Sequence, residues 1–211
     1  MRKEDHMNQA IGWAGAGTGF TFLMTALGAS VVFILRKDMG KNIQRAFLGF
    51  AAGVMMAASV WSLLLPAIEE TEEMGGIGWV PAAGGFILGG IFLYMLDFLM
   101  PHLHLGEKQP EGVKTSFHRT TLLVLAVTLH NIPEGMAVGL AFAMAAQHPE
   151  DSALYASAFA LALGIGIQNF PEGAAISLPL RQEGMSRGRA FMLGALSGLV
   201  ELIFGIGITL I

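Results

Sequence analysis

The run TLLVLAVTLHNIPEGMAVGLAFAMAA, residues 121–146, is apolar throughout except for a few polar positions and holds one acidic side chain, that of Glu134. A helix needs roughly 20 apolar residues to cross the hydrocarbon core of a bilayer, which is about 30 Å thick. Backbone groups in lipid must be paired internally, and the run is far longer than a barrel strand. Residues 121–146 therefore predict a transmembrane helix.

The rest of the chain repeats this character. Five further apolar runs lie approximately at residues 11–35, 46–66, 80–100, 152–180 and 190–211. Of the 211 residues 54% are hydrophobic and 13% are charged, against roughly 25% charged in an ordinary soluble domain. The 28 glycines suit closely packed membrane helices, and the absence of cysteine excludes thiolate metal ligands. We predict an all-α integral membrane protein, a polytopic bundle of six transmembrane helices forming one transporter domain over residues 1–211.

Charge between the runs predicts the orientation. The first, third and fifth loops hold most of the basic residues, namely Arg36, Lys37, Lys41, Arg45, Lys108, Lys114, Arg119, Arg181, Arg187 and Arg189. The two loops on the other side hold the acidic residues Glu69, Glu70, Glu72, Glu73, Glu150 and Asp151. By the positive-inside rule the odd loops are cytoplasmic and the N-terminus is outside. We expect a multi-pass protein of the plasma (inner) membrane, with no nucleic-acid partner because basic residues are few and scattered.

Five ionisable residues lie within the apolar runs. They are Asp97, His130, Glu134, Glu172 and Glu201. An acidic residue at the centre of a membrane helix costs about 2.5 to 3.5 kcal/mol, and such residues usually mark ion or substrate pathways. A bound cation is the simplest explanation for several of them in one chain.

A duplicated motif organises these residues. The hexapeptide HNIPEG at residues 130–135 returns as QNFPEG at residues 168–173. In each copy the first residue and the glutamate are four apart, so they share one helix face. The asparagine lies three residues before the same glutamate, so each carboxylate can serve two neighbouring ions. The candidate ligands are His130, Asn131, Glu134, Gln168, Asn169, Glu172 and Glu201.

The prolines of the motif support a site at membrane depth. Pro133 and Pro171 lack the amide hydrogens that would bond the carbonyls of Leu129 and Ile167. Freed carbonyls are tolerated in the membrane where they line a binding site. The two motif helices are joined by a short loop and must be antiparallel, which implies inverted-repeat pseudo-symmetry with the site between the repeats.

The ligand types narrow the choice of ion. Imidazole, carboxylate and carboxamide donors suit zinc, iron(II), manganese, cobalt, nickel or cadmium better than copper(I) or magnesium. Met55 is a further soft donor, although methionine is usually core filler. At the end of the third run Asp97, His102 and His104 stand where an ion would leave, with solvated loop histidines as the alternative.

Together these residues resemble the ZIP family of metal transporters, and most closely its bacterial GufA-like branch. The resemblance rests on both motif copies, on Ser197 to Glu201, on Ala51 to Met55 and on Asp97 to His104. It implies uptake of zinc or a related divalent ion, such as iron, manganese or cadmium, into the cytoplasm by alternating access. It also implies a homodimer and no organic cofactor. The family has eight helices, so the resemblance implies that the last two are missing and the chain is truncated at its C-terminus.

The resemblance also assigns ligands to a binuclear site between the fourth and fifth helices. One ion would take His130, Glu134, Gln168, Glu172 and Met55. Its neighbour would take Asn131, Asn169, Glu201 and the shared glutamates, while Asp97, His102 and His104 would match the exit route.

Two other functions fit the same residues. An intramembrane zinc metallohydrolase would hold a metal-activated water, but a catalytic zinc usually has three protein ligands and an open position. A proton-linked solute carrier would use the glutamates as relays, and its transport would be unaffected by EDTA. We expect a transporter and not an enzyme.

Overall fold

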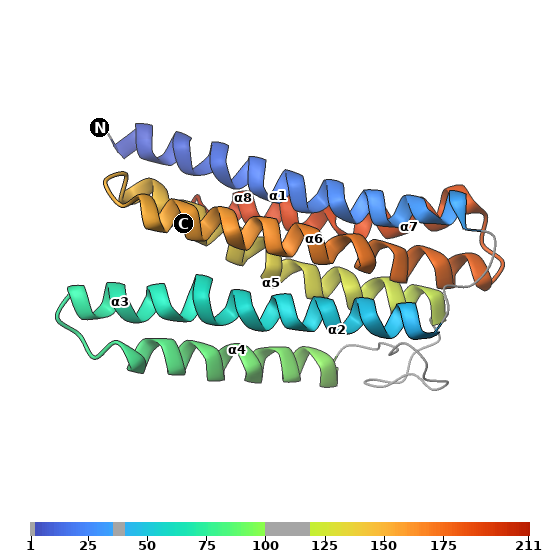
Figure 1. The fold of residues 1–211 in the computed structure, drawn as a ribbon, viewed down its shortest axis with the longest axis horizontal. Coiled ribbons are helices and arrows are strands. Elements are labelled where there is room, and N and C mark those ends of the chain that lie inside the picture. Colours follow the sequence, from blue (N-terminus) through green and yellow to red (C-terminus); the bar gives the residue numbers. More distant parts are fainter. Residues whose placement is uncertain (1–2, 36–40, 100–118) are drawn as a thin grey trace.

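The computed structural model describes residues 3–35, 41–99 and 119–211, and every regular element in this part of the chain is helical. Six elongated helical segments lie along one common axis (Figure 1). They are α1 (Lys3–Ile34), the continuous segment α2 (Lys41–Ala58), η1 (Ser59–Leu64) and α3 (Leu65–Glu73), then α4 (Trp79–Leu99), α5 (Arg119–Gln147), α6 (Ser152–Gln182), and the segment α7 (Arg187–Ser197) and α8 (Leu199–Ile208). The prediction of an all-helical chain is confirmed, and the segments follow the order of the six predicted runs.

Five stretches are long and apolar enough to cross a membrane. They are His6–Ile34, Ala52–Glu73, Thr121–Gln147, Ser152–Gln182 and Arg187–Ile208. The apolar stretch described in α4, Trp79–Met95, is shorter. Its large side chains face outward, with Phe86, Ile87 and Leu88 each at least 60% exposed. A continuous apolar exterior of this kind suits a lipid environment rather than water.

The second segment is longer than predicted. Glu69 to Glu73 were expected in a loop, but they form the last turns of α3 because glutamate is a good helix former. The helix ends where Gly75 adopts a positive φ of 79°. There the amide of Gly75 bonds the Glu72 carbonyl and that of Gly76 bonds the Thr71 carbonyl, which satisfies the terminal carbonyl groups.

The prolines of the motif do not interrupt their helices. Pro133 lies inside α5, and Pro171 and Pro179 lie inside α6. The backbone does break between α7 and α8, where Gly198 separates the two helices. That break places Glu201 in the first turn of α8.

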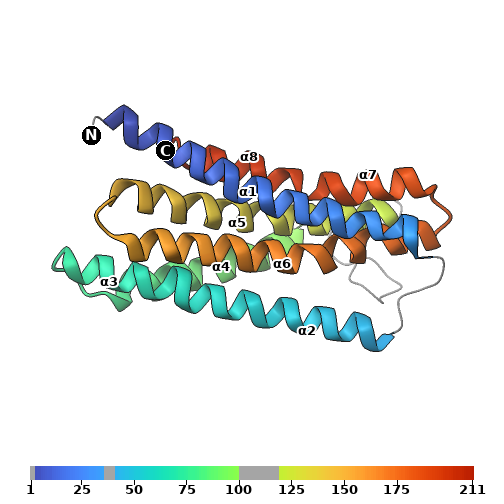
Figure 2. The ribbon, with the colours of Figure 1, turned by 45° about the horizontal axis from the view of Figure 1, so that its top comes forward.

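Glycines let the inner helices approach one another closely. A side-chain carbon on Gly28 of α1 would overlap the carbonyl oxygen of Phe170 in α6. One on Gly139 of α5 would overlap the carbonyl oxygen of Gly205 in α8. Figure 2 shows α1, α5, α6, α7 and α8 as one bundle, with α2 and α3 along one side of it. By contrast, glycines of α4 such as Gly84 and Gly89 face open space.

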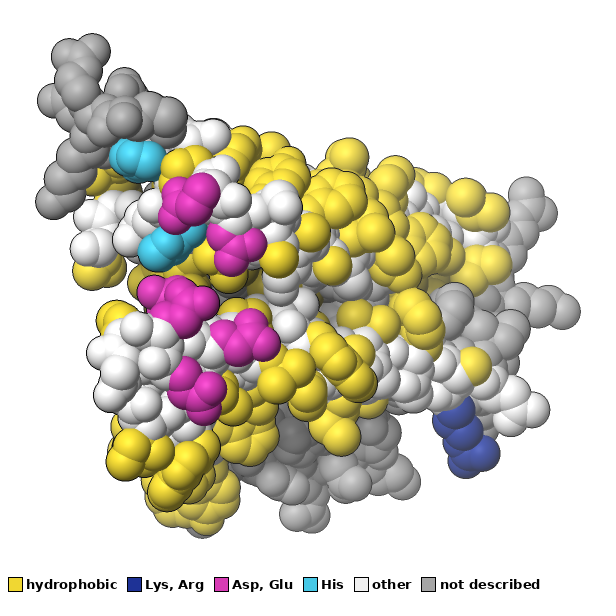
Figure 3. All heavy atoms as spheres, turned by 60° about the vertical axis from the view of Figure 1, so that its left-hand side comes forward, with side chains coloured by type: hydrophobic (Ala, Val, Ile, Leu, Met, Phe, Trp, Pro, Cys, Tyr) yellow, Lys and Arg dark blue, Asp and Glu magenta, His cyan; other side chains and the backbone are white. Residues whose placement is uncertain are grey.

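The ends of the bundle differ in charge. Figure 3 shows Asp, Glu and His side chains gathered at one end. There His148, after α5, lies 3.7 Å from Glu70 of α3 and 3.6 Å from Glu150. Arg181 and Arg187 belong to the opposite end, where α6 finishes and α7 begins. This asymmetry matches the distribution of charge predicted for the loops.

Candidate metal site

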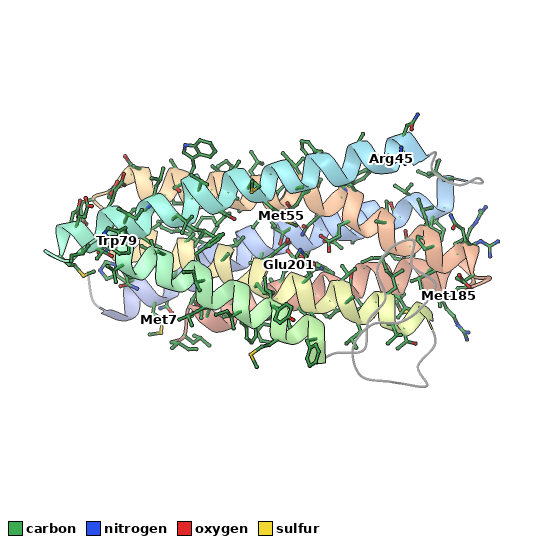
Figure 4. All side chains as sticks on the ribbon, turned by 90° about the horizontal axis from the view of Figure 1, so that it is seen from below. Met7, Arg45, Met55, Trp79, Met185 and Glu201 are labelled. Carbon is green, nitrogen blue, oxygen red and sulfur yellow. The ribbon has the colours of Figure 1, made fainter. Side chains whose placement is uncertain are left out.

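The two copies of the motif meet near the middle of the bundle. Gln168 of α6 donates a hydrogen bond from Nε2 to Oε1 of Glu134 in α5, over 2.8 Å. Figure 4 shows Glu201 and Met55 at mid-length, well away from Arg45 and Trp79 at the two ends. The contact joins the first residue of one copy to the glutamate of the other, as a site between the repeats requires.

The first half of the cluster pairs an imidazole with a carboxylate. His130 Nε2 lies 3.6 Å from Glu134 Oε1, which is too long for a good hydrogen bond. Two ligands of a tetrahedral zinc ion, each about 2.1 Å from the metal, lie about 3.4 Å apart. The side chain of His130 is 50% exposed and that of Glu134 is 11% exposed. The His130 and Glu134 side chains are therefore spaced as two ligands of one zinc ion would be, and the imidazole is accessible from outside the bundle.

The second half is completely enclosed. Asn131, Asn169 and Glu201 are fully buried, with no exposed area. Asn169 donates from Nδ2 to both carboxylate oxygens of Glu201, at 2.8 and 2.9 Å. Asn131 donates from Nδ2 to the Ser197 carbonyl at 3.1 Å. The NH₂ groups of Asn131 and Asn169 thus both donate hydrogen bonds to other groups of the protein.

The buried oxygens that accept no hydrogen bond indicate what kind of ligand the cluster binds. Among the residues described, seven buried side-chain polar atoms have no hydrogen-bond partner, and five of them belong to the motif. These five are Asn131 Oδ1, Glu134 Oε2, Gln168 Oε1, Asn169 Oδ1 and Glu172 Oε1. Each orphaned buried acceptor costs about 1 to 3 kcal/mol. Since all five are acceptors, a cation satisfies them and an anion does not.

The last residue of each motif copy has a packing role that the sequence did not reveal. A side-chain carbon on Gly135 would overlap the backbone of Glu201 in α8. One on Gly173 would overlap the carbonyl oxygen of Thr25 in α1. The glycines therefore bring α8 and α1 against the motif, and Glu201 reaches the cluster because of the first contact.

The predicted ligands are not all equally placed. Met55 is half-buried in α2, and its neighbour Val54 lies against Gly164 of α6, but no described contact joins Met55 to the glutamates. The side chain of Asp97, and all of His102 and His104, lie outside the described residues.

Amides are bonded to the carboxylates of the cluster. Among the side chains that the structure describes, no three His, Asp or Glu residues are arranged to hold one ion together. Asn169 donates to Glu201 and Gln168 donates to Glu134. The structure therefore brings most of the predicted donors together as an amide–carboxylate network.

One neighbour of the site, Thr21, was not predicted from the sequence. The carbonyl of Thr21 in α1 accepts a hydrogen bond from Asn169 Nδ2 at 3.4 Å. A buried threonine in an apolar helix gives no signal of its own, since its hydroxyl is ordinarily satisfied within the helix. Only the helix packing identifies it.

Comparison with known proteins places the chain in a family. No family model matches it. Human zinc transporter ZIP11 is 38% identical, over 90% of this chain and 78% of the relative. Zinc transporter GufA of Myxococcus xanthus is also 38% identical, over 86% of this chain and 70% of the relative. Zinc transporter ZupT of Salmonella newport is 33% identical, over 87% and 70% respectively. Identities of this size across most of both proteins show that the chain is a multi-pass membrane protein of the ZIP family of zinc transporters.

Proposed function

We propose that this chain carries zinc, or a related divalent ion such as iron(II), manganese or cadmium, across the membrane through the cluster between α5 and α6. The observation that carries the proposal is the set of five orphaned, buried oxygens, all of them acceptors and all from the duplicated motif. The relatives ZIP11, GufA and ZupT are each named zinc transporters, which agrees with the donor set.

The ligands divide between two adjacent ions. The first takes His130, Glu134, Gln168, Glu172 and Met55. The second takes Asn131, Asn169 and Glu201 together with the shared glutamates. Glu134 and Glu172 each keep one free buried oxygen, which suits a carboxylate shared between two ions.

Loading exchanges one set of bonds for another. Without an ion, Gln168 holds Glu134 and Asn169 holds Glu201 by hydrogen bonds. An arriving cation takes the carboxylate oxygens and the free amide oxygens, while the NH₂ groups turn away. The amides therefore stabilise the carboxylates between ions and keep the binding reversible, as transport requires.

The inward direction of transport follows the resemblance to the ZIP family, and charge gives the orientation of the protein. The end with Glu70 and Glu150 lies outside and attracts cations, and the end with Arg181 and Arg187 lies in the cytoplasm of a cell with this protein in its plasma membrane. The ion leaves past Asp97, His102 and His104 as one helix group moves against the other. Inverted-repeat symmetry and a homodimer complete the proposal.

Uptake of zinc, cadmium and iron(II) into proteoliposomes tests this function. We expect wild-type uptake that EDTA abolishes, and loss of at least tenfold in Glu134→Gln and in Glu172→Gln. Glu183→Gln, an exposed acid after α6 at the opposite end, is the matched control and keeps wild-type uptake. Flux that persists in EDTA, or in both buried variants, would overturn the proposal and favour a proton-linked carrier.

A further inference from the structure

A row of threonines runs along one face of α1. Thr18, Thr21 and Thr25 are all completely buried, and their spacing of three and four residues keeps them on one side of the helix. Each hydroxyl bonds a carbonyl of the preceding turn, Thr18 to Ala14 at 2.6 Å, Thr21 to Thr18 at 2.9 Å and Thr25 to Thr21 at 3.2 Å. By these bonds alone the three threonines are equivalent.

Their partners on α8 make them different. The face opposite consists of Gly198, Glu201 and Gly205, which are also three and four residues apart. The side chain of Thr18 lies against Gly205 and that of Thr25 lies against Gly198. The antiparallel register therefore places the Thr21 side chain beside the Glu201 carboxylate.

Thr21 also reaches the amide that holds Glu201. Asn169 Nδ2 donates to the Thr21 carbonyl at 3.4 Å and to the two Glu201 oxygens at 2.8 and 2.9 Å. The NH₂ group of Asn169 is thus fixed between α1 and α8, and the free Oδ1 is held away from both partners. Thr18 and Thr25 make no such contact, since glycines face them.

We propose that Thr21 is a positioning residue of the metal site, which orients both the Glu201 carboxylate and the Asn169 amide for the second ion. Its hydroxyl has two acceptors within reach, the Thr18 carbonyl and Glu201. In the structure it donates to the Thr18 carbonyl, with the Glu201 carboxylate beside it. The effect on the second ion rests on the proposed function, whereas the position of Thr21 beside Glu201 does not.

Three substitutions separate positioning from packing. Thr21→Val keeps the shape and removes the hydroxyl, Thr21→Ser restores the hydroxyl, and Thr18→Val makes the same change over a glycine. Zinc titration of each purified protein by calorimetry measures affinity and stoichiometry. We expect Thr21→Val to bind the second zinc ion about tenfold more weakly, with Thr21→Ser and Thr18→Val within about twofold of wild type. Equal affinities for Thr21→Val and Thr18→Val would overturn the proposal.

A second measurement needs no metal binding. Thermal unfolding of the zinc-free protein in lipid nanodiscs, for Thr21→Val, Glu201→Gln and the double variant, gives the coupling between the two side chains. We expect a non-additive Tm change for this pair and additive changes for Thr18→Val with Glu201→Gln. If the wild type bound no zinc but the coupling appeared, the proposed function would fail and the positioning contact would stand. Additive Tm changes in both double-variant cycles would contradict the proposed contact between Thr21 and Glu201.

Discussion

The open half of the cluster, His130 with Glu134 and Gln168, comes from the duplicated motif alone, whereas the enclosed half, Asn169 with Glu201, joins a motif residue to an acid of α8. In the open half the imidazole is half-exposed and lies 3.6 Å from its carboxylate. In the enclosed half every side chain is fully buried, and Asn169 occupies both oxygens of Glu201. A duplicated motif therefore supplies the donors, and the packing of α1 and α8 decides how accessible each donor is.

The largest effect is expected where the enclosing helices touch the motif. Gly173→Ala forces a methyl group into the Thr25 carbonyl of α1, and Gly135→Ala forces one into the backbone of Glu201. We expect each variant to lose about 3 kcal/mol of stability, the upper end of the usual cost of overpacking, because the methyl group meets backbone atoms. Gly207→Ala, which faces open space in α8, is the control and should be neutral or slightly stabilising. Thermal unfolding in nanodiscs measures all three variants. Equal melting temperatures would show that the close packing of α1 and α8 against the motif does not cause the difference between the open and the enclosed half.

Removing one side chain from each half tests the comparison itself. Asn169→Ala leaves the buried Glu201 carboxylate without the two hydrogen bonds that it accepts from the Asn169 NH₂ group, so we expect a loss of about 1.5 to 3 kcal/mol in the zinc-free protein. His130→Ala removes a half-exposed side chain and should cost less than about 0.5 kcal/mol. Chemical denaturation or thermal unfolding without zinc gives both values. A larger loss for His130→Ala would reverse the roles assigned to the two halves.

The smallest effect concerns protons. The imidazole and carboxylates must be deprotonated to bind a metal, so zinc binding should release protons and its affinity should rise with pH. Zinc titrations in two buffers of different ionisation enthalpy check this directly. We expect unequal apparent heats in wild type and a smaller difference in Glu134→Gln. Identical heats in both buffers would mean that no proton leaves the cluster.

Much of the architecture was readable from the sequence because long apolar runs in a chain with few charges have few structural solutions. The doubled motif also predicted the contact between α5 and α6, where the first residue of one copy, Gln168, bonds the glutamate of the other, Glu134. Membership of the ZIP family, whose members are transporters and not enzymes, removes the metallohydrolase alternative.

The remaining features depend on tertiary packing. Glu69 to Glu73 read as a charged loop, but helix propensity carries α3 through them. The pairing of Thr21 with Glu201 depends on the register between α1 and α8, which is set by glycine contacts at Gly198 and Gly205 and leaves no pattern along the chain. For the same reason the sequence did not distinguish an open half from an enclosed one.

The most direct test of the central claim is anomalous diffraction at the zinc absorption edge from crystals of the zinc-loaded protein. The account predicts a metal peak between α5 and α6, about 2.0 to 2.2 Å from carboxylate oxygens of Glu134 and Glu172 and within ligand distance of His130. The peak should disappear in Glu134→Gln crystals that keep the same fold. Zinc found only at the acidic end of the bundle, with the cluster unchanged, would contradict the account.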